Sequence, residues 1–299
     1  MNTPVHVPIL TEVLLEHLQL RPGDRCIDAT VDGGGHTAAM LARTAPDGCV
    51  LGIDRDPELL SGLRRRLASE IDGGRLRLAC GSFRQLAEIA AAHEFAALRA
   101  VIFDVGVSSY HFDLSGRGFS FQRDEPLDMR FDPTDRSSES AADLLNSRDV
   151  EELETIFGGW GEERFSGRIA RAVARARPLQ TTSQLLEVIT RALPGNVRWQ
   201  AARSAARIFQ ALRIAVNDEL DAIAAALPQA LDLLAPQGRL AVLSFHSLED
   251  RIVKQFFVAE RQAGRVRILT KKPIRAGDEE IAANPRAGSA KLRVCERLA

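Results

Sequence analysis

The sequence lacks the marks of a secreted, membrane-spanning or disulfide-stabilised protein. Its four cysteines lie far apart and form no C-x-x-C pair, so we expect neither a zinc knuckle nor a disulfide framework. No stretch approaches the roughly 20 apolar residues that a membrane span requires. Residues 1–20 have no basic start followed by an apolar segment, so no signal peptide is expected. These absences predict a cytoplasmic protein without a membrane partner.

The sequence also has no large excess of positive or negative residues. The formal net charge is -1, so any nucleic-acid partner must be held by local patches and not by bulk charge. The composition is that of a globular protein, with 45% hydrophobic and 26% charged residues over 299 positions. A chain of this length can bury a sizeable core. Cys26, Cys49 and Cys80 fall in apolar, strand-like runs and are predicted to be buried free thiols.

Short apolar runs alternate with helical stretches in the first third of the chain and again near its end. In the first third we expect strands at 25–30, 49–54, 75–80 and 100–104, with helices at 37–44, 56–69 and 83–95. Near the end we expect a helix at 217–234, a strand at 238–245, a helix at 248–261 and closing strands at 265–269 and 291–298. This alternation predicts a Rossmann-like, doubly wound α/β sheet with parallel strands.

A different pattern interrupts the sheet. Residues 108–135 are rich in Gly, Asp, Arg and Phe and have no period, and their aromatic content predicts a long structured loop. From 137 to 216 the pattern is helical, with Ser137 or Ser138 capping one helix and Thr181, Thr182 or Ser183 another. We therefore expect an inserted α-helical substrate-recognition domain at 113–214, between the two parts of the sheet domain at 1–112 and 215–299.

A glycine motif at 28–36 follows the first expected strand. Gly33, Gly34 and Gly35 allow a sharp turn and a close approach of a ligand to the amides that open the next helix. Asp54 ends the second strand, where a carboxylate can accept ribose hydroxyls. A nucleotide-like ligand is expected here; the alternative is a plain glycine turn with a capping aspartate.

The identity of that ligand depends on later residues. Gly33-x-Gly35-x-x-Ala38 fits a loose dinucleotide fingerprint, which leaves an NAD-linked oxidoreductase as one hypothesis. Two features favour S-adenosylmethionine. The third strand leads into Phe83, against which an adenine could lie, and the fourth ends in Asp104 and a flexible turn at the mouth of the site. The alternative role for Asp104 is a loop cap.

A second motif, at 244–251, places His246 at the carboxyl end of a strand, where substrate groups belong. Ser247 with Asp250 is typical of a capping box at a helix start. No G-x-S-x-G elbow is present, so a serine hydrolase is not expected. His246 and Glu249 lack further partners as metal ligands, so no metal site is expected. His246 is retained as a candidate catalytic residue.

Two basic clusters could bind a phosphate backbone. One has three- and four-residue spacing, which gives a single helix face; a solvated face is the alternative. The other lies in residues 265–299, which carry nine Lys or Arg against four acids. The candidate RNA-binding residues are Arg164, Arg168, Arg171, Arg175, Arg286, Lys291 and Arg293.

Ten stretches, in order along the chain, resemble one family. They are HVPIL at 6–10, GGH at 34–36, GIDRDP at 52–57, DVGVSS at 104–109, RGFSF at 117–121, PLDMR at 126–130, GEERF at 161–165, FQALRIAVN at 209–217, SFHSLEDR at 244–251 and NPR at 284–286. The family is the bacterial 16S ribosomal RNA cytosine-N4 methyltransferases, also called ribosomal small-subunit methyltransferase H or MraW. The resemblance extends nearly from end to end.

The resemblance implies an S-adenosylmethionine site. The residues that fall where that family contacts the cofactor are Gly34, Gly35, His36, Asp54, Phe83 and Asp104. His111 takes the place of a glutamine that the family uses, and is included with them. Asp32 replaces a glycine that the family has before Gly-Gly-His. Both departures lie in the cofactor loops.

The reaction implied is methyl transfer to the exocyclic N4 of a cytidine in the decoding region of 16S ribosomal RNA, within the small subunit. Asp104 and the backbone of residues 105–108 are the candidates to hold the amine, and Tyr110, Phe112 or Phe119 could receive a flipped base. Carbon-5 methylation is not favoured, because it needs a cysteine nucleophile and none lies in these motifs. A non-catalytic RNA-binding or assembly protein is the remaining alternative. The oligomeric state stays open, with a homodimer among the options.

Overall fold

The chain folds into two units. The computed structural model describes residues 8–299, so the first two positions of the HVPIL stretch, His6 and Val7, lie outside the described residues. The first unit combines the residues up to Gly106 with Leu220–Ala299, and the second unit is Val107–Glu219. These divisions fall a few residues from those expected at 112 and 214. No helix between residues 8 and 299 is both long and apolar enough to cross a membrane.

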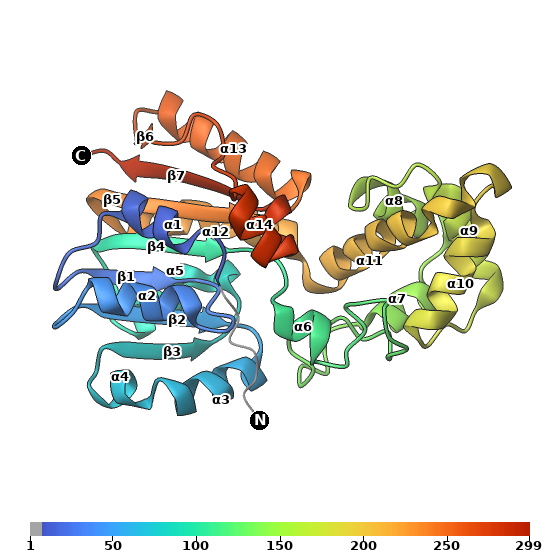
Figure 1. The fold of residues 1–299 in the computed structure, drawn as a ribbon, viewed down its shortest axis with the longest axis horizontal. Helices are drawn as coiled ribbons and strands as arrows, with labels where there is room; N and C mark the ends of the chain where they lie inside the picture. Colours follow the sequence, from blue (N-terminus) through green and yellow to red (C-terminus); the bar gives the residue numbers. More distant parts are fainter. Residues whose placement is uncertain (1–7) are drawn as a thin grey trace. The chain divides into compact units, whose positions relative to one another are not determined.

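The first unit is built on one seven-stranded sheet (Figure 1). Its order is β3-β2-β1-β4-β5-β7-β6. The strands are β1 (Arg25–Asp28), β2 (Cys49–Asp54), β3 (Leu76–Cys80), β4 (Leu98–Asp104), β5 (Leu234–Ser244), β6 (Val266–Ile268) and β7 (Lys291–Arg297). Neighbours among the first five pair in parallel, whereas β7 is antiparallel to both β5 and β6. The order reverses beside β1, as in a doubly wound sheet, so the expected α/β architecture is confirmed.

Helices cover both faces of this sheet, which gives two hydrophobic cores. One core lies under α1 (Thr11–Leu18), α2 (Gly35–Arg43), α3 (Pro57–Arg66), α4 (Ala68–Asp72), α14 (Asp278–Ala283) and η3 (Pro285–Ser289). The other lies under α5 (Leu86–Ala92), α12 (Glu219–Leu233) and α13 (Ser247–Gln262). Because the central strands are covered on both sides, β4 is an almost unbroken buried run.

The outermost parallel strand, β3, departs from the sequence prediction. Cys80 is exposed and Cys49 is only partly buried, so the prediction of buried thiols holds for Cys26 alone of the three. For Cys80 the reason is topological: β3 pairs on one side only, with β2. Cys49 is the first residue of β2, which pairs on both sides. The helix expected at 56–69 is divided into α3 and α4. The one expected at 83–95 begins as the 3-10 turn η1 (Phe83–Gln85) before α5.

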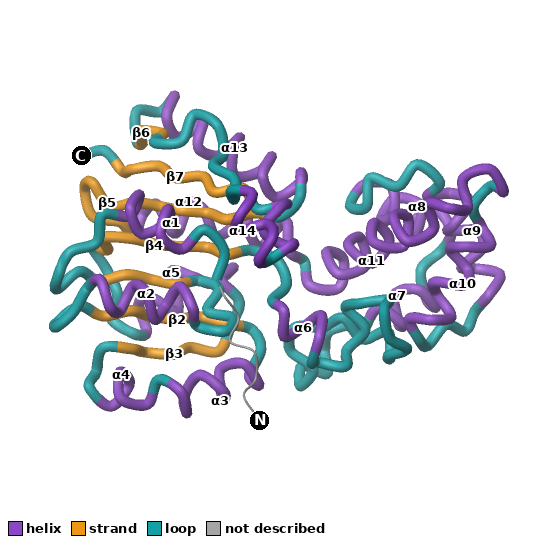
Figure 2. The backbone as a smooth tube through the Cα atoms, viewed as in Figure 1, coloured by secondary structure: helices purple, strands orange, loops and turns teal. Residues whose placement is uncertain are grey.

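The second unit is helical, as expected (Figure 2). It contains α6 (Ser109–Asp113), α7 (Ala141–Ser147), α8 (Val150–Gly159), α9 (Ser166–Ala176), α10 (Thr182–Ala192), η2 (Gly195–Gln200) and α11 (Ala201–Asn217). These elements share one apolar core. Thr181 caps α10, in agreement with the prediction. Ser140 caps α7 through Asp143, so the caps predicted at Ser137 and Ser138 were wrong.

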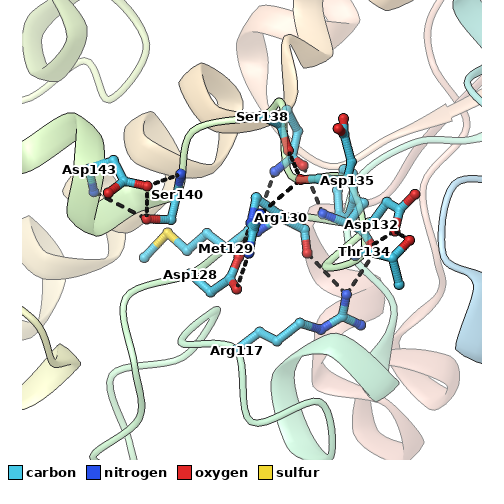
Figure 3. A network of polar contacts seen from close by, with 12 residues as sticks. Arg117, Asp128, Met129, Arg130, Asp132, Thr134, Asp135, Ser138, Ser140 and Asp143 are labelled. Carbon is cyan, nitrogen blue, oxygen red and sulfur yellow. Dashed lines mark hydrogen bonds and ion pairs between the residues drawn. The ribbon is translucent and has the colours of Figure 1, made fainter.

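The long segment before α7 stays ordered through side chains (Figure 3). Arg130 makes two hydrogen bonds to the Asp128 carboxylate, at 2.7 and 2.9 Å, and a third to the Asp135 carbonyl at 2.9 Å. Arg117 donates to the carbonyls of Arg130 and Phe131 at 3.0 and 2.7 Å. Backbone groups that have no helix or strand partner are satisfied in this way. The segment is therefore a structured loop, as its aromatic content predicted.

Candidate functional site

Acidic side chains gather where the central strands of the first unit end. β1 ends at Asp28, β2 at Asp54 and β4 at Asp104, and these three strands are neighbours in the sheet. Ligands of open α/β sheets bind at this edge, beside the point where the strand order reverses. The sequence prediction that Asp54 and Asp104 share one edge with the glycine motif is therefore confirmed by the sheet order.

The glycine turn between β1 and α2 accepts no larger residue at two positions. Gly34 has φ 72°, and a Cβ built on it would overlap Leu63 of α3. A Cβ on Gly35 would lie 2.6 Å from Cγ of Pro8. Gly34 occupies the N-cap position of α2, and because it has no side chain it makes no capping hydrogen bond. The first amides of the helix are therefore free of a capping oxygen and can face a ligand.

Asp54 organises the loops around this turn. One carboxylate oxygen accepts a hydrogen bond from the amide of Asp32 at 2.8 Å, and the other accepts from the amide of Asp56 at 2.9 Å. Asp56 in turn caps α3. A carboxylate oxygen has two lone pairs, so it can accept from a ribose hydroxyl in addition to a backbone amide. The sequence prediction for Asp54 is compatible with this geometry.

His36 and Asp104 form the buried centre of the site. Nε2 of His36 lies 3.4 Å from Oδ2 of Asp104, and the two residues are 5% and 8% exposed. The amide of Asp104 donates to the Thr30 hydroxyl at 2.6 Å. Burial by itself lowers the pKa of His36, but Asp104 and then Asp28 outweigh it, so the pKa is raised above its ordinary value. The proximity of Asp104 therefore favours the protonated form of His36.

Asp28 and its partners were missed by the sequence reasoning as site residues. Its carboxylate accepts from the Thr37 hydroxyl at 2.6 Å and from the Thr30 amide at 3.2 Å. Complete burial raises the pKa of Asp28 in spite of these hydrogen bonds. The position of Asp28 shortly before a glycine turn could have indicated its place in the site. No sequence pattern indicates Thr30 or Thr37, because their roles depend on tertiary contacts.

Asp32 stands at the tip of the same loop with φ 46°, in the left-handed region. Burial and then the carboxylate of Asp54, with Asp104, Asp28 and Asp56 further down, raise the pKa of Asp32 well above its ordinary value. A glycine would adopt this backbone conformation without strain. Asp32 is therefore both conformationally and electrostatically disfavoured where it stands.

Phe83 borders the site on the side of β3. It is half-buried and meets Phe103 edge-on, with ring centroids 5.6 Å apart and an interplanar angle of 88°. The amide of Gly81, two residues before it, donates to the Asp54 carbonyl at 2.8 Å. The end of β3 is thus tied to the end of β2. An adenine beside Phe83 stays a prediction.

His246 has a capping role that the sequence reasoning placed one residue too late. It is the N-cap of α13, and Glu249 completes the capping box. Its Nε2 also lies 2.9 Å from Oε1 of the fully buried Glu249. Asp250 is instead held by Arg293, at 2.6 and 3.2 Å, so the box expected from Ser247 and Asp250 was wrong. A strand-borne arginine with no local signal competes for that carboxylate.

His111, predicted among the cofactor contacts, belongs to the second unit. It is buried at the start of α6, and its Nδ1 accepts a hydrogen bond from the amide of Ser108 at 3.3 Å. The ring meets Phe119 and Phe131 at centroid distances of 5.1 and 5.2 Å. The imidazole therefore caps a helix and packs in an aromatic cluster.

The predicted RNA contacts differ in their accessibility. Arg164, Arg168, Arg171 and Arg175 are exposed in or just before α9, whose opposite face is buried. Arg286 is exposed in η3. Lys291 is partly buried, 3.9 Å from Asp250. The side chain of Arg293 is 9% exposed and holds Asp250 with two hydrogen bonds, so we correct its assignment from RNA contact to buried ion pair.

The chemistry of this edge fits a nucleoside that carries positive charge. Four carboxylates surround the glycine turn, and a pyrophosphate placed among them would be repelled. Oδ1 of Asp104 is buried and accepts no hydrogen bond from residues 8–299, and such an atom calls for a donor from a ligand. These features define the class of protein: an α/β enzyme that binds a cationic nucleoside cofactor.

Comparison with known proteins identifies the family. The model of the MraW methylase family matches residues 3–298, and the chain belongs to this family. A relative named ribosomal RNA small subunit methyltransferase H, from Syntrophotalea carbinolica, is 46% identical, with 98% of each chain covered. Relatives of the same name from Thermomicrobium roseum and Heliobacterium modesticaldum are 46% and 44% identical; 98% of this chain and 94% and 98% of those proteins are covered.

Membership of a methylase family decides between the two cofactors that the glycine motif left open. The cofactor is S-adenosyl-L-methionine, which suits the acidic edge described above. The hypothesis of an NAD-linked oxidoreductase was wrong. Its only support was the loose spacing of Gly33 and Gly35, which any sharp strand-to-helix turn can satisfy.

Proposed function

We propose that this chain methylates the exocyclic N4 of a cytidine in the decoding region of 16S ribosomal RNA, within the small ribosomal subunit of the cytoplasm. The family and the names of its relatives support an RNA methyltransferase. The N4 target rests on the resemblance described above. The observation that carries the chemistry is the buried Asp104 oxygen that accepts no hydrogen bond within residues 8–299, beside His36.

Residues of the first unit would hold the cofactor. Gly34 and Gly35 let it approach the amides of α2, Asp54 accepts the ribose hydroxyls, and Phe83 borders the base. Bound S-adenosylmethionine supplies an electrophilic methyl group and departs as a neutral thioether. The chain therefore needs to position and desolvate the reactants more than to activate a leaving group.

Asp104 is the candidate catalytic residue. The amine of cytosine is a weak nucleophile because its lone pair is delocalised into the ring. A hydrogen bond from N4–H to the free oxygen of Asp104 localises that pair. With the methyl group supplied by the bound cofactor and the thioether leaving, Asp104 would accept the proton that N4 loses. His36, whose pKa Asp104 raises against the effect of burial, lies 3.4 Å from the other oxygen of this carboxylate.

The base must leave its stack to reach such a site, and aromatic side chains were proposed to receive it. Phe119 does not suit this role, because it is 4% exposed and stacks on Phe131 with centroids 5.7 Å apart. Tyr110 and Phe112 are partly exposed and stay candidates. His246, committed to the cap of α13, is a less direct candidate than Asp104.

The deciding experiment is methyl transfer from labelled S-adenosylmethionine to small subunits that lack the modification, with the product nucleoside identified by mass spectrometry. We expect N4-methylcytidine. A 5-methylcytidine product would overturn the N4 assignment. Cofactor binding without any transfer would favour the non-catalytic RNA-binding alternative. Naked 16S RNA as a parallel substrate shows whether the assembled subunit is required.

A further inference from the structure

Positive charge is concentrated in one part of the second unit. Residues 164–217 contain ten arginines, no lysine and a single acidic residue, Glu187, although the whole chain has a net charge of -1. The second unit as a whole contains more acidic residues than arginines, so the excess of positive charge belongs to this segment alone. The segment, and not the whole unit, would attract a polyanion.

Three of these arginines pair with carboxylates, and a fourth, Arg177, is partly buried. Arg207 lies 3.7 Å from Glu163, Arg191 pairs with Glu187, and Arg213 makes hydrogen bonds of 2.8 and 2.9 Å to Glu219. Arg177 donates to backbone carbonyls. For the six others, no carboxylate within residues 8–299 forms an ion pair; they are Arg164, Arg168, Arg171, Arg175, Arg198 and Arg203.

The unpaired arginines fall on two segments that the fold connects. Arg164 precedes α9, and three more lie on the exposed face of that helix. Arg198 lies in η2 and Arg203 in the first turn of α11. Nε of Arg168 donates a hydrogen bond to the carbonyl of Ala192, the last residue of α10. Two residues separate Ala192 from η2, so this hydrogen bond holds α9 close to the start of η2.

Trp199 lies among these charges and is 81% exposed, more than any other large hydrophobic residue described. Its neighbours Val197 and Ala201 pack against the apolar core of the second unit, so the helical path turns the indole away from that core. Trp199 and Arg203 are four residues apart along the path from η2 into α11. At this spacing two side chains lie on the same face.

We infer that Trp199, with Arg198 and Arg203, forms a stacking site for single-stranded RNA that docks the substrate on the second unit. The indole offers a flat surface for an unpaired base, and the two guanidinium groups meet the phosphates on either side. The inference rests on the proposed function in taking ribosomal RNA as the substrate. RNA is favoured over an acidic protein because the proposed function takes ribosomal RNA as the substrate and unpaired bases stack on aromatic side chains.

The test uses the full-length protein and fluorescein-labelled oligouridine of about 12 nucleotides, a length within the range that single-strand sites cover. Fluorescence anisotropy gives the dissociation constant. We expect Trp199→Ala to weaken binding about five- to hundredfold, and Trp199→Phe to stay within about threefold of the wild type. Arg203→Gln should reduce the slope of log K against log salt by about 0.7.

Leu114→Ala is the matched control, because Leu114 is a 55% exposed apolar residue of the same unit with no adjoining arginine pair. It should leave binding unchanged. Thermal unfolding should be the same for all variants, since each side chain is exposed. Unchanged RNA affinity in folded Trp199→Ala would overturn the inference. So would a wild-type protein that binds polyglutamate as tightly as RNA, with both affinities unchanged in Trp199→Ala.

Turnover, measured separately on small subunits, distinguishes this inference from the proposed function. If Trp199→Ala weakens oligouridine binding but the wild-type protein transfers no methyl group, the methyltransferase proposal is rejected. The stacking site then stands as an RNA-binding site. Normal transfer by Trp199→Ala at low subunit concentration, with unchanged oligouridine binding, would reject the stacking site alone.

Discussion

Nε2 of His36 lies 3.4 Å from Oδ2 of Asp104, and both side chains are almost fully buried. His36 belongs to the first turn of α2 and Asp104 ends β4, so the pair joins the glycine turn to the strand end. The other oxygen of Asp104 has no hydrogen-bond partner within residues 8–299. One oxygen is thus held by the protein and the second is left for a ligand.

Replacing Asp104 should therefore stop the chemistry before it harms the fold. Asp104→Asn keeps the shape but loses the anionic acceptor, and we expect turnover on small subunits to fall about 10²- to 10⁴-fold. Cofactor binding by calorimetry and the melting temperature report whether the site survives. Asp104→Ala should show the same loss. Turnover at the wild-type rate in either folded variant would remove Asp104 from the mechanism.

The same substitution should lower the pKa of His36. Burial lowers this pKa and Asp104 is the largest influence that raises it, so Asp104→Asn leaves burial opposed mainly by Asp28. Titration followed by NMR, with His36→Gln to assign the resonance, measures the change. In the wild type, the raised pKa means that His36 contributes stability fully below about pH 6.5, the ordinary value, and loses it as pH rises through the folded-state pKa. An unchanged His36 titration would show that the pair is uncoupled.

A methyl group at Gly34 should damage the glycine turn. Gly34 has φ 72° and its Cβ would overlap Leu63, so Gly34→Ala combines backbone strain with overpacking. We expect a loss of about 2–4 kcal/mol in the free energy of unfolding, and weaker cofactor binding. Gly62→Ala is the matched control. Gly62 lies inside α3 with nothing within 4 Å of its Cβ position, so alanine there should stabilise by about 0.5–1 kcal/mol. Equal effects at the two sites would contradict this account.

Several of these relationships could be predicted from the sequence and several could not. β2 was predicted from Cys49 to Asp54 because an apolar run ending on an acid before a proline is a purely local signal. The proximity of Asp54 and Asp104 followed from the parallel topology. The contact between His36 and Asp104 depends on tertiary packing and has no local pattern. The same holds for the pairing of Asp250 with Arg293, which displaced the expected capping box.

Asp32 should cost the protein stability at neutral pH. Its pKa is raised by burial and by the carboxylate of Asp54, so the folded state resists ionisation of this group. A raised pKa means that stability is fully present below about pH 3.9, the ordinary value, and is lost as pH rises through the folded-state pKa. Asp32→Asn removes the charge and tolerates the left-handed backbone. Urea unfolding should show the variant more stable at pH 7.5, by a margin that narrows toward pH 4.5. A margin independent of pH would mean that Asp32 is not strained by its charge.

Substitutions of His111 test whether this residue caps a helix or contacts the cofactor. The amide of Ser108 donates to its Nδ1 and the ring packs against Phe119 and Phe131, so His111→Ala removes both a cap and a buried ring. We expect a loss of about 2–4 kcal/mol in unfolding free energy. Glutamine at this third helical position can accept from the capping amide, so His111→Gln should recover part of that loss. Calorimetry with S-adenosylmethionine completes the test. If His111→Gln keeps its stability but loses cofactor affinity, the residue touches the cofactor as the family resemblance predicted. If a His111 variant loses stability while its affinity for S-adenosylmethionine stays within about threefold of the wild type, His111 acts by capping α6. A lost cofactor contact would change the affinity by more than that.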